Sequence, residues 1–149
     1  MNSFSLIFQN KILGLSLASM LIAQILKVIT NFITYKKFEI TRFVETGGMP
    51  SSHSSFVSTL TTCMGLAKGF NSPEFAACFV FSMIIMYDAA GVRKAVGEQA
   101  KIINRIILKF EQKDHNVDKE LKELIGHTRL QVIAGAALGI IIGLFYDVI

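Results

Sequence analysis

Long apolar segments alternate with polar segments along the chain, and this alternation predicts several membrane-spanning helices. The first apolar segment runs from Ile12 to about Thr34 and is interrupted by Lys27. A third runs from Glu74 to about Ala90, and the last from Leu130 to Ile149. At about 1.5 Å per helical residue, segments of about 20 residues cross a hydrocarbon core of about 30 Å.

The second apolar segment, His53 to about Gly69, is more polar than the others. It carries a run of small hydroxylated side chains: Ser54, Ser55, Ser58, Thr59, Thr61 and Thr62. Such side chains suit a helix that is buried among other helices. We therefore expect about four spans in an all-α, polytopic transmembrane bundle. If this segment is only a re-entrant helix, the number of spans and the topology change.

The longest polar region, Gly91 to Arg129, predicts an amphipathic helix. Apolar residues recur there at helical spacing, with a neighbouring basic stripe: Ile102, Ile103, Ile106, Ile107 and Phe110, with Lys101, Arg105 and Lys109. This pattern is typical of a helix that lies in the membrane interface. Asp118 to Ile125 predicts a second short helix.

The last apolar segment carries Gly135, Gly139 and Gly143, four residues apart on one helical face. Small residues at this spacing favour close contact between helices, either within the chain or in a homo-oligomer.

Composition and charge agree with a membrane protein of one domain, residues 1–149. Apolar residues make up 52% of the 149 residues and charged residues only 17%. With four spans, one side of the membrane holds 12 of the 15 Lys and Arg residues. These are Lys36, Lys37, Arg42, Arg93, Lys94, Lys101, Arg105, Lys109, Lys113, Lys119, Lys122 and Arg129. The excess of positive charge predicts that this side is cytoplasmic, in a multi-pass protein of the cell membrane. No nucleic-acid partner is expected.

Three polar clusters converge on the same side. In Gly47-Gly48-Met49-Pro50-Ser51-Ser52-His53, the glycines allow unusual backbone angles, and Ser51 or Ser52 can cap the following helix. The free N–H groups and dipole of that helix make an anion site beside His53. The alternative is an ordinary Gly-Pro turn before a capped helix.

The second and third clusters supply further charges and a second histidine. Asp88 near the end of a span needs a partner, and Arg93 could pair with it or clamp a phosphate. His127 lies at a membrane boundary, four residues after Glu123. It could also be an interfacial histidine without a functional role. Lys27 lies about two turns inside its span; it could snorkel to the surface, but we favour an inward position near a bound phosphate.

Together these groups are what phosphoryl transfer without a metal or cofactor requires. One histidine attacks phosphorus, a second protonates the leaving oxygen, and cations with backbone N–H groups hold the phosphate oxygens.

The motifs also resemble a known family. Pro50-Ser51-Ser52-His53 is similar to the Pro-Ser-Gly-His signature of the type 2 phosphatidic acid phosphatases, which share a fold with vanadium-dependent haloperoxidases. The run Gly126 to Gly135 resembles the end of their third motif. Gly-Gly-Met-Pro-Ser-Ser-His-Ser, Tyr-Asp-Ala-x-Gly-Val-Arg and Gly-His-Thr resemble the divergent branch of that superfamily, and the similarity extends from Ala23 to Gly143.

The resemblance implies a role for each candidate residue. His127 would be the nucleophile, His53 the general acid and Arg93 the arginine of the third motif. Lys27 or Arg42 would replace the cations of the first motif, and Ser52 with the backbone of Gly48 would cradle the phosphate.

Two departures from the parent family accompany these roles. Here 34 residues separate Arg93 from His127, and Gln131 stands where an aspartate would orient the histidine. Glu123 and Asp88 are the carboxylates that could replace it.

The sequence thus predicts a phosphatase acting on a lipid phosphate or diphosphate through a phosphohistidine. A non-catalytic binder or transporter of a phosphorylated lipid or anion is the second hypothesis, and a purely structural membrane protein is the third.

Overall fold

The described part of the chain is helical, as expected for an all-α protein. The computed structural model describes residues 5–36, 48–111 and 127–148. The helices are α1 (Ser5–Phe8), α2 (Lys11–Tyr35), α3 (Ser52–Lys68), α4 (Pro73–Ala90), α5 (Val92–Glu111) and α6 (Arg129–Gly143), which a 3₁₀ turn, Leu144–Asp147, extends. The predicted helix Asp118 to Ile125 lies outside the described residues.

Local sequence signals explain where the long helices begin. Asn10 caps α2, because its side chain accepts a hydrogen bond from the Leu13 N–H at 3.1 Å. Ser72 caps α4 through the Phe75 N–H at 3.2 Å, and Pro73 follows in the first turn, where its missing N–H has no consequence. These caps place the starts of α2 and α4 one residue before the predicted apolar segments.

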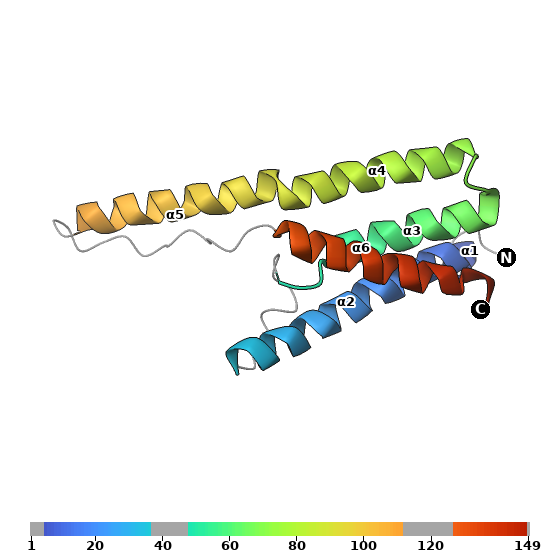
Figure 1. The fold of residues 1–149 in the computed structure, drawn as a ribbon, viewed down its shortest axis with the longest axis horizontal. Helices are drawn as coiled ribbons and strands as arrows, with labels where there is room; N and C mark the ends of the chain where they lie inside the picture. The colour runs from blue at the N-terminus through green and yellow to red at the C-terminus, as the bar shows by residue number, and fades with distance from the viewer. Residues whose placement is uncertain (1–4, 37–47, 112–126, 149) are drawn as a thin grey trace.

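Helix α3 lies at the centre of the bundle and packs against α2, α4 and α6 (Figure 1). Hydroxyl groups connect it to each neighbour. The Ser55 and Ser19 hydroxyls hydrogen bond at 2.5 Å between α3 and α2. Thr61 and Ser82 do so at 2.6 Å between α3 and α4, and Thr59 Oγ1 donates to a carbonyl of α6 at 2.9 Å. The prediction that this segment is buried among other helices is confirmed.

The glycine face of α6 packs against α3 within the chain. A Cβ at Gly135 would collide with the Ser51 carbonyl, and one at Gly139 with the Ser55 carbonyl. A Cβ at Gly143 would come within 2.6 Å of the Thr62 side chain. Of the two alternatives raised for this face, the structure contains the contact within the chain, and the homo-oligomer stays a prediction.

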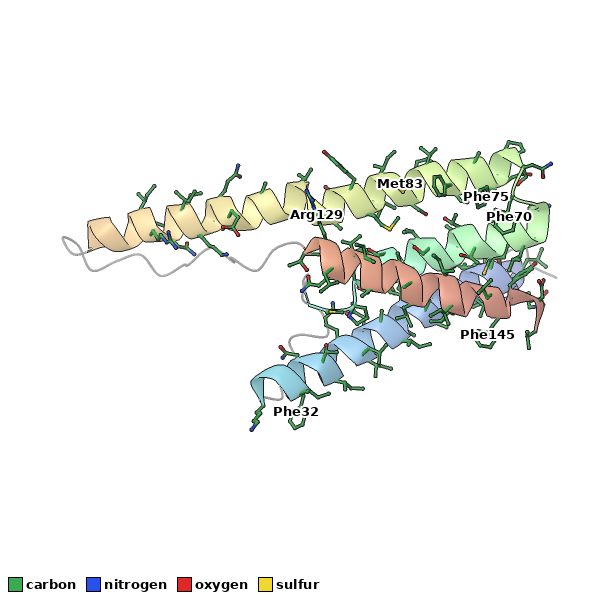
Figure 2. The ribbon with its side chains drawn as sticks, in the orientation of Figure 1. Phe32, Phe70, Phe75, Met83, Arg129 and Phe145 are labelled. Carbon is green, nitrogen blue, oxygen red and sulfur yellow. The ribbon has the colours of Figure 1, made fainter. Side chains whose placement is uncertain are left out.

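The outer surface of the bundle is apolar. Large side chains such as Phe32, Met83 and Phe145 are exposed on α2, on α4 and beyond α6 (Figure 2). Within the described residues, three helical segments are long and apolar enough to cross a membrane: Lys11–Ile33, Pro73–Ile107 and Arg129–Asp147. The α3 segment does not join them, because it has 17 residues and many hydroxyl groups. We expected about four spans, and the described residues contain three candidate spans.

Helices α4 and α5 follow one another around Gly91, and α5 extends beyond the other helices (Figure 1). Among the described residues, α5 packs only against α4. Helices α2, α3, α4 and α6 alternate in direction. The two ends of the chain therefore lie at one end of the bundle, and the starts of α3 and α6 at the other (Figure 1).

Candidate functional site

The turn that leads into α3 forms one wall of the candidate site. Gly48 has φ +88°, a left-handed conformation that favours glycine. Ser51 caps α3: its hydroxyl accepts from the Ser54 N–H at 3.4 Å and from the Ser54 hydroxyl at 3.0 Å. Ser51 and Ser52 are both buried. The first turn of α3, with its N–H groups and positive dipole end, therefore begins inside the protein.

Three long-range hydrogen bonds hold this wall and His127 together. The Thr30 hydroxyl of α2 donates to the Met49 carbonyl at 2.6 Å. The Ser51 N–H donates to the Gln131 carbonyl of α6 at 3.0 Å, and the His127 N–H donates to the Ala89 carbonyl of α4 at 3.0 Å. Groups from all four helices of the bundle thus meet at one end, where the starts of α3 and α6 lie.

The two candidate histidines face each other across this junction. The ring centroids of His53 and His127 are 6.5 Å apart, and their planes make an angle of 63°. His53, in the first turn of α3, is exposed, whereas His127 is only 3% exposed. Residues 74 positions apart in the chain are therefore close enough to contact one small anion from two directions.

Lys27 lies in the same region, buried within α2. It is 3% exposed, and its Cγ would be 2.8 Å from a Cβ at Gly48, so its aliphatic stem packs on that glycine. Eight residues separate it from the end of α2, a depth of about 12 Å. Of the two alternatives for Lys27, the inward position agrees with the structure and snorkelling does not.

The surroundings of His127 favour its neutral form. Burial lowers the pKa of His127 below its ordinary value, and the positive charge of Lys27 lowers it further. The Gln131 side chain and the Gly48 backbone act in the opposite direction, and the proximity of His53 lowers the pKa again. Its Nδ1 is buried and has no hydrogen-bond partner among the described residues. A buried ring nitrogen without a partner calls for a structural or functional explanation.

Helices α4 and α5 bring the second cluster to the same junction. Asp88, in the last turn of α4, adjoins Ala89, which accepts the hydrogen bond from His127. Arg93 follows in the first turn of α5. Arg93 and His127 are 34 positions apart in the chain, and the hydrogen bond from His127 to Ala89 brings their backbone segments together. The side chain of Arg93 lies outside the described part of the structure, as do Arg42 and Glu123.

Two contributors were not expected from the sequence. Thr128 and Gln131 form a capping box at the start of α6: the Gln131 side chain accepts from the Thr128 N–H at 2.9 Å, and Thr128 Oγ1 accepts from the Gln131 N–H at 3.3 Å. The Thr-x-x-Gln spacing is the signal that could have revealed it. The Thr30 contact to Met49 has no comparable signal, because it depends on how α2 packs. No cluster of three or more His, Cys, Asp or Glu side chains able to hold a metal occurs among the described residues.

Comparison with known proteins identifies the family of the chain. Residues 8–142 match the Divergent PAP2 family. The chain belongs to this family. The uncharacterized membrane protein YuiD of Bacillus subtilis (strain 168) is 41% identical over 140 residues, which cover 87% of this chain and 89% of the relative. No solved structure matches the chain. The resemblance drawn from the motifs is therefore confirmed at the level of the family, and the chain is a membrane protein with three candidate helical spans.

Proposed function

We propose that this protein is a membrane-embedded, metal-independent phosphatase that acts on a lipid phosphate or diphosphate through a phosphohistidine at His127. One observation carries the proposal: the imidazoles of His53 and His127, 6.5 Å apart, lie beside the buried Lys27 and the start of α3. A nucleophile, a proton donor and fixed positive charge are the parts that phosphoryl transfer requires.

The geometry suggests how the reaction proceeds. Neutral His127 attacks phosphorus, and a phosphorus–nitrogen bond forms as the bond from phosphorus to the lipid oxygen breaks. His53 gives its proton to that oxygen, so the lipid leaves as an alcohol, or as a monophosphate if the substrate is a diphosphate. Water then attacks the phosphohistidine, His53 takes a proton from the water, and inorganic phosphate leaves. Lys27 and the first N–H groups of α3 stabilise the charge on the phosphate oxygens.

The lowered pKa of His127 supports its role as the nucleophile. A protonated imidazole has no lone pair for attack, and both burial and Lys27 favour the neutral ring. The same Lys27 charge attracts the anionic substrate. Lys27 therefore both attracts the substrate and keeps His127 in its neutral, nucleophilic form.

The bundle also supports a placement in the membrane. The alternating directions of α2, α3, α4 and α6 agree with four passes (Figure 1), and the excess of Lys and Arg on the side of the site favours the cytoplasmic side. Helix α4 has 18 residues, about 27 Å in length, so α5 begins close to the membrane surface. The exposed Ile102, Ile103 and Ile106 of α5 suit the interface at headgroup depth.

Phosphate release from phosphatidic acid by the purified protein in detergent tests the proposal. His127→Ala should abolish release and also the acid-labile phosphoenzyme that radiolabelled substrate forms. His53→Ala should slow both by at least about a hundredfold, the usual contribution of a general acid. The third histidine supplies a matched control, since His115→Ala should retain activity. Full release by His127→Ala would contradict the proposal.

One observation favours a second function, the non-catalytic binding or transport of a phosphorylated lipid or anion. Gln131 carries no charge, and its side-chain oxygen accepts from the Thr128 N–H, so the imidazolium of His127 has no carboxylate partner among the described residues at that position. A binder would take up phosphatidic acid saturably without releasing phosphate, and His127→Gln would leave that binding intact.

A further inference from the structure

Three faces of α3 are covered by neighbouring helices. Helix α6 covers the face that carries Ser51, Ser55 and Thr62, against which its glycines pack. Helix α4 covers another face, where the Ser82 hydroxyl donates to the Val57 carbonyl at 3.1 Å. Helix α2 covers the adjoining face, and the Ser19 hydroxyl meets the Ser55 hydroxyl at the edge between α2 and α6. These contacts leave one side of α3 uncovered by the other described helices, the side opposite α6.

That fourth side is a stripe that begins at the candidate site. It consists of His53, Phe56, Leu60, Met64 and Ala67, which recur at three- and four-residue spacing and so share one helical face. His53 and Ala67 are exposed, and the other three are half-buried. Among the described residues, α2 and α4 do not contact each other, so the α3 stripe is open between them.

We infer that the α3 stripe binds a hydrocarbon chain of the phosphorylated lipid whose headgroup occupies the site at His53 and His127. The inference rests on the proposed function. His53 must reach the oxygen that joins phosphate to lipid, and the hydrocarbon portion of the substrate starts near that oxygen. Because His53 is the first residue of the α3 stripe, a chain that leaves this point and enters the membrane runs along the stripe.

The size and chemistry of the stripe fit this occupant. From His53 to Ala67 it is about 21 Å long, more than the ~15 Å depth of one leaflet. Below the histidine its side chains are wholly apolar, and Met64 is a flexible one that adapts to varied chain shapes. The ligand is thus a lipid with an anionic phosphate at one end and a chain long enough to cross its own leaflet.

A single tryptophan can report on the chain directly. The protein has no tryptophan, so Leu60→Trp supplies the only indole fluorescence. We expect phosphatidic acid with brominated chains to quench it at several-fold lower concentration than brominated phosphatidylcholine in the same micelles. An excess of unbrominated phosphatidic acid should reverse the quenching.

Ile140→Trp is the matched control. It follows Gly139, which packs against Ser55 and Ser58, so it lies at a similar depth, and it is exposed on α6. Both brominated lipids should quench it equally. Met64→Trp provides a second probe if Leu60→Trp does not fold. Equal quenching by the two lipids at both stripe positions would overturn the inference, as would protection of the stripe from both lipids by a second copy of the chain.

The outcomes separate this inference from the proposed phosphatase. The quenching is measured in the His127→Gln background, where no turnover occurs. If quenching is selective but the wild-type protein releases no phosphate, the lipid chain binds the α3 stripe and the protein is not a phosphatase. If the wild-type protein releases phosphate but quenching is not selective, the protein is a phosphatase and the lipid chain does not bind the α3 stripe.

Discussion

Replacing Gly48 with alanine tests the junction between α2 and the turn before α3. Two effects add. The φ of +88° places an alanine in the left-handed region, which costs about 1–2 kcal/mol. The new Cβ would also lie 2.8 Å from Lys27 Cγ and 3.0 Å from Lys27 Cδ. Overpacking of this kind costs about 1–3 kcal/mol, so Gly48→Ala should lower the free energy of unfolding by about 2–5 kcal/mol.

A double-mutant cycle separates the two effects. Lys27→Ala removes the Cγ and Cδ atoms, so in that background Gly48→Ala should retain only the backbone cost of about 1–2 kcal/mol. The coupling between the two substitutions should therefore be at least about 1 kcal/mol. The free energies can be measured by denaturant titration in mixed micelles.

Gly14→Ala is the control for this cycle. Gly14 lies in α2, where an added Cβ would have nothing within 4 Å, so Gly14→Ala should be neutral or stabilise by up to about 1 kcal/mol. If the Gly48 and Lys27 substitutions add within about 0.5 kcal/mol, the Lys27 stem does not pack on Gly48 and the inward position of that lysine is wrong.

Three further predictions concern the rest of the bundle. Gly135→Ala should push α6 away from the carbonyl at the start of α3, destabilise the protein by about 1–3 kcal/mol and lower phosphate release, since His127 moves with α6; unchanged stability relative to Gly14→Ala would refute this. Because burial lowers the pKa of His127, stability should be full above about pH 6.5 and fall as the pH drops through the lowered pKa; thermal unfolding between about pH 7.5 and 5 should show this fall, and His127→Gln should flatten it. Thr61→Val and Ser82→Ala should be coupled by about 0.6 kcal/mol, and a cycle with no coupling would contradict their hydrogen bond.

The helices were largely predictable because their signals are local. The apolar segment Ile12–Thr34 differs from α2 by one residue at each end, and the hydroxyl-rich second segment forms the buried α3. The short α1 carries no long apolar run and was not expected. The number of spans was harder to predict, because α3 combines the alternating direction of a span with the composition of a buried helix.

The candidate site was predictable in its residues but not in its connections. His53, Lys27 and His127 stand out in the sequence because each is a polar residue at or inside a membrane boundary. The hydrogen bond from the Ser51 N–H to Gln131, in contrast, joins two backbone groups, and backbone groups are the same at every residue. The sequence directs attention to Gln131 for its effect on His127, whereas the structure also uses it to cap α6.

The polarity of α3 has a consequence for how the protein is made. Its hydroxyl groups find their partners on α2, α4 and α6, and α6 begins 61 residues after α3 ends. During synthesis α3 therefore leaves the ribosome before its principal neighbour exists, with too little apolar surface to remain in lipid alone. Stable insertion of α3 should therefore depend on the C-terminal helix, so substitutions in the glycines of α6 should also lower the amount of protein that accumulates in the membrane.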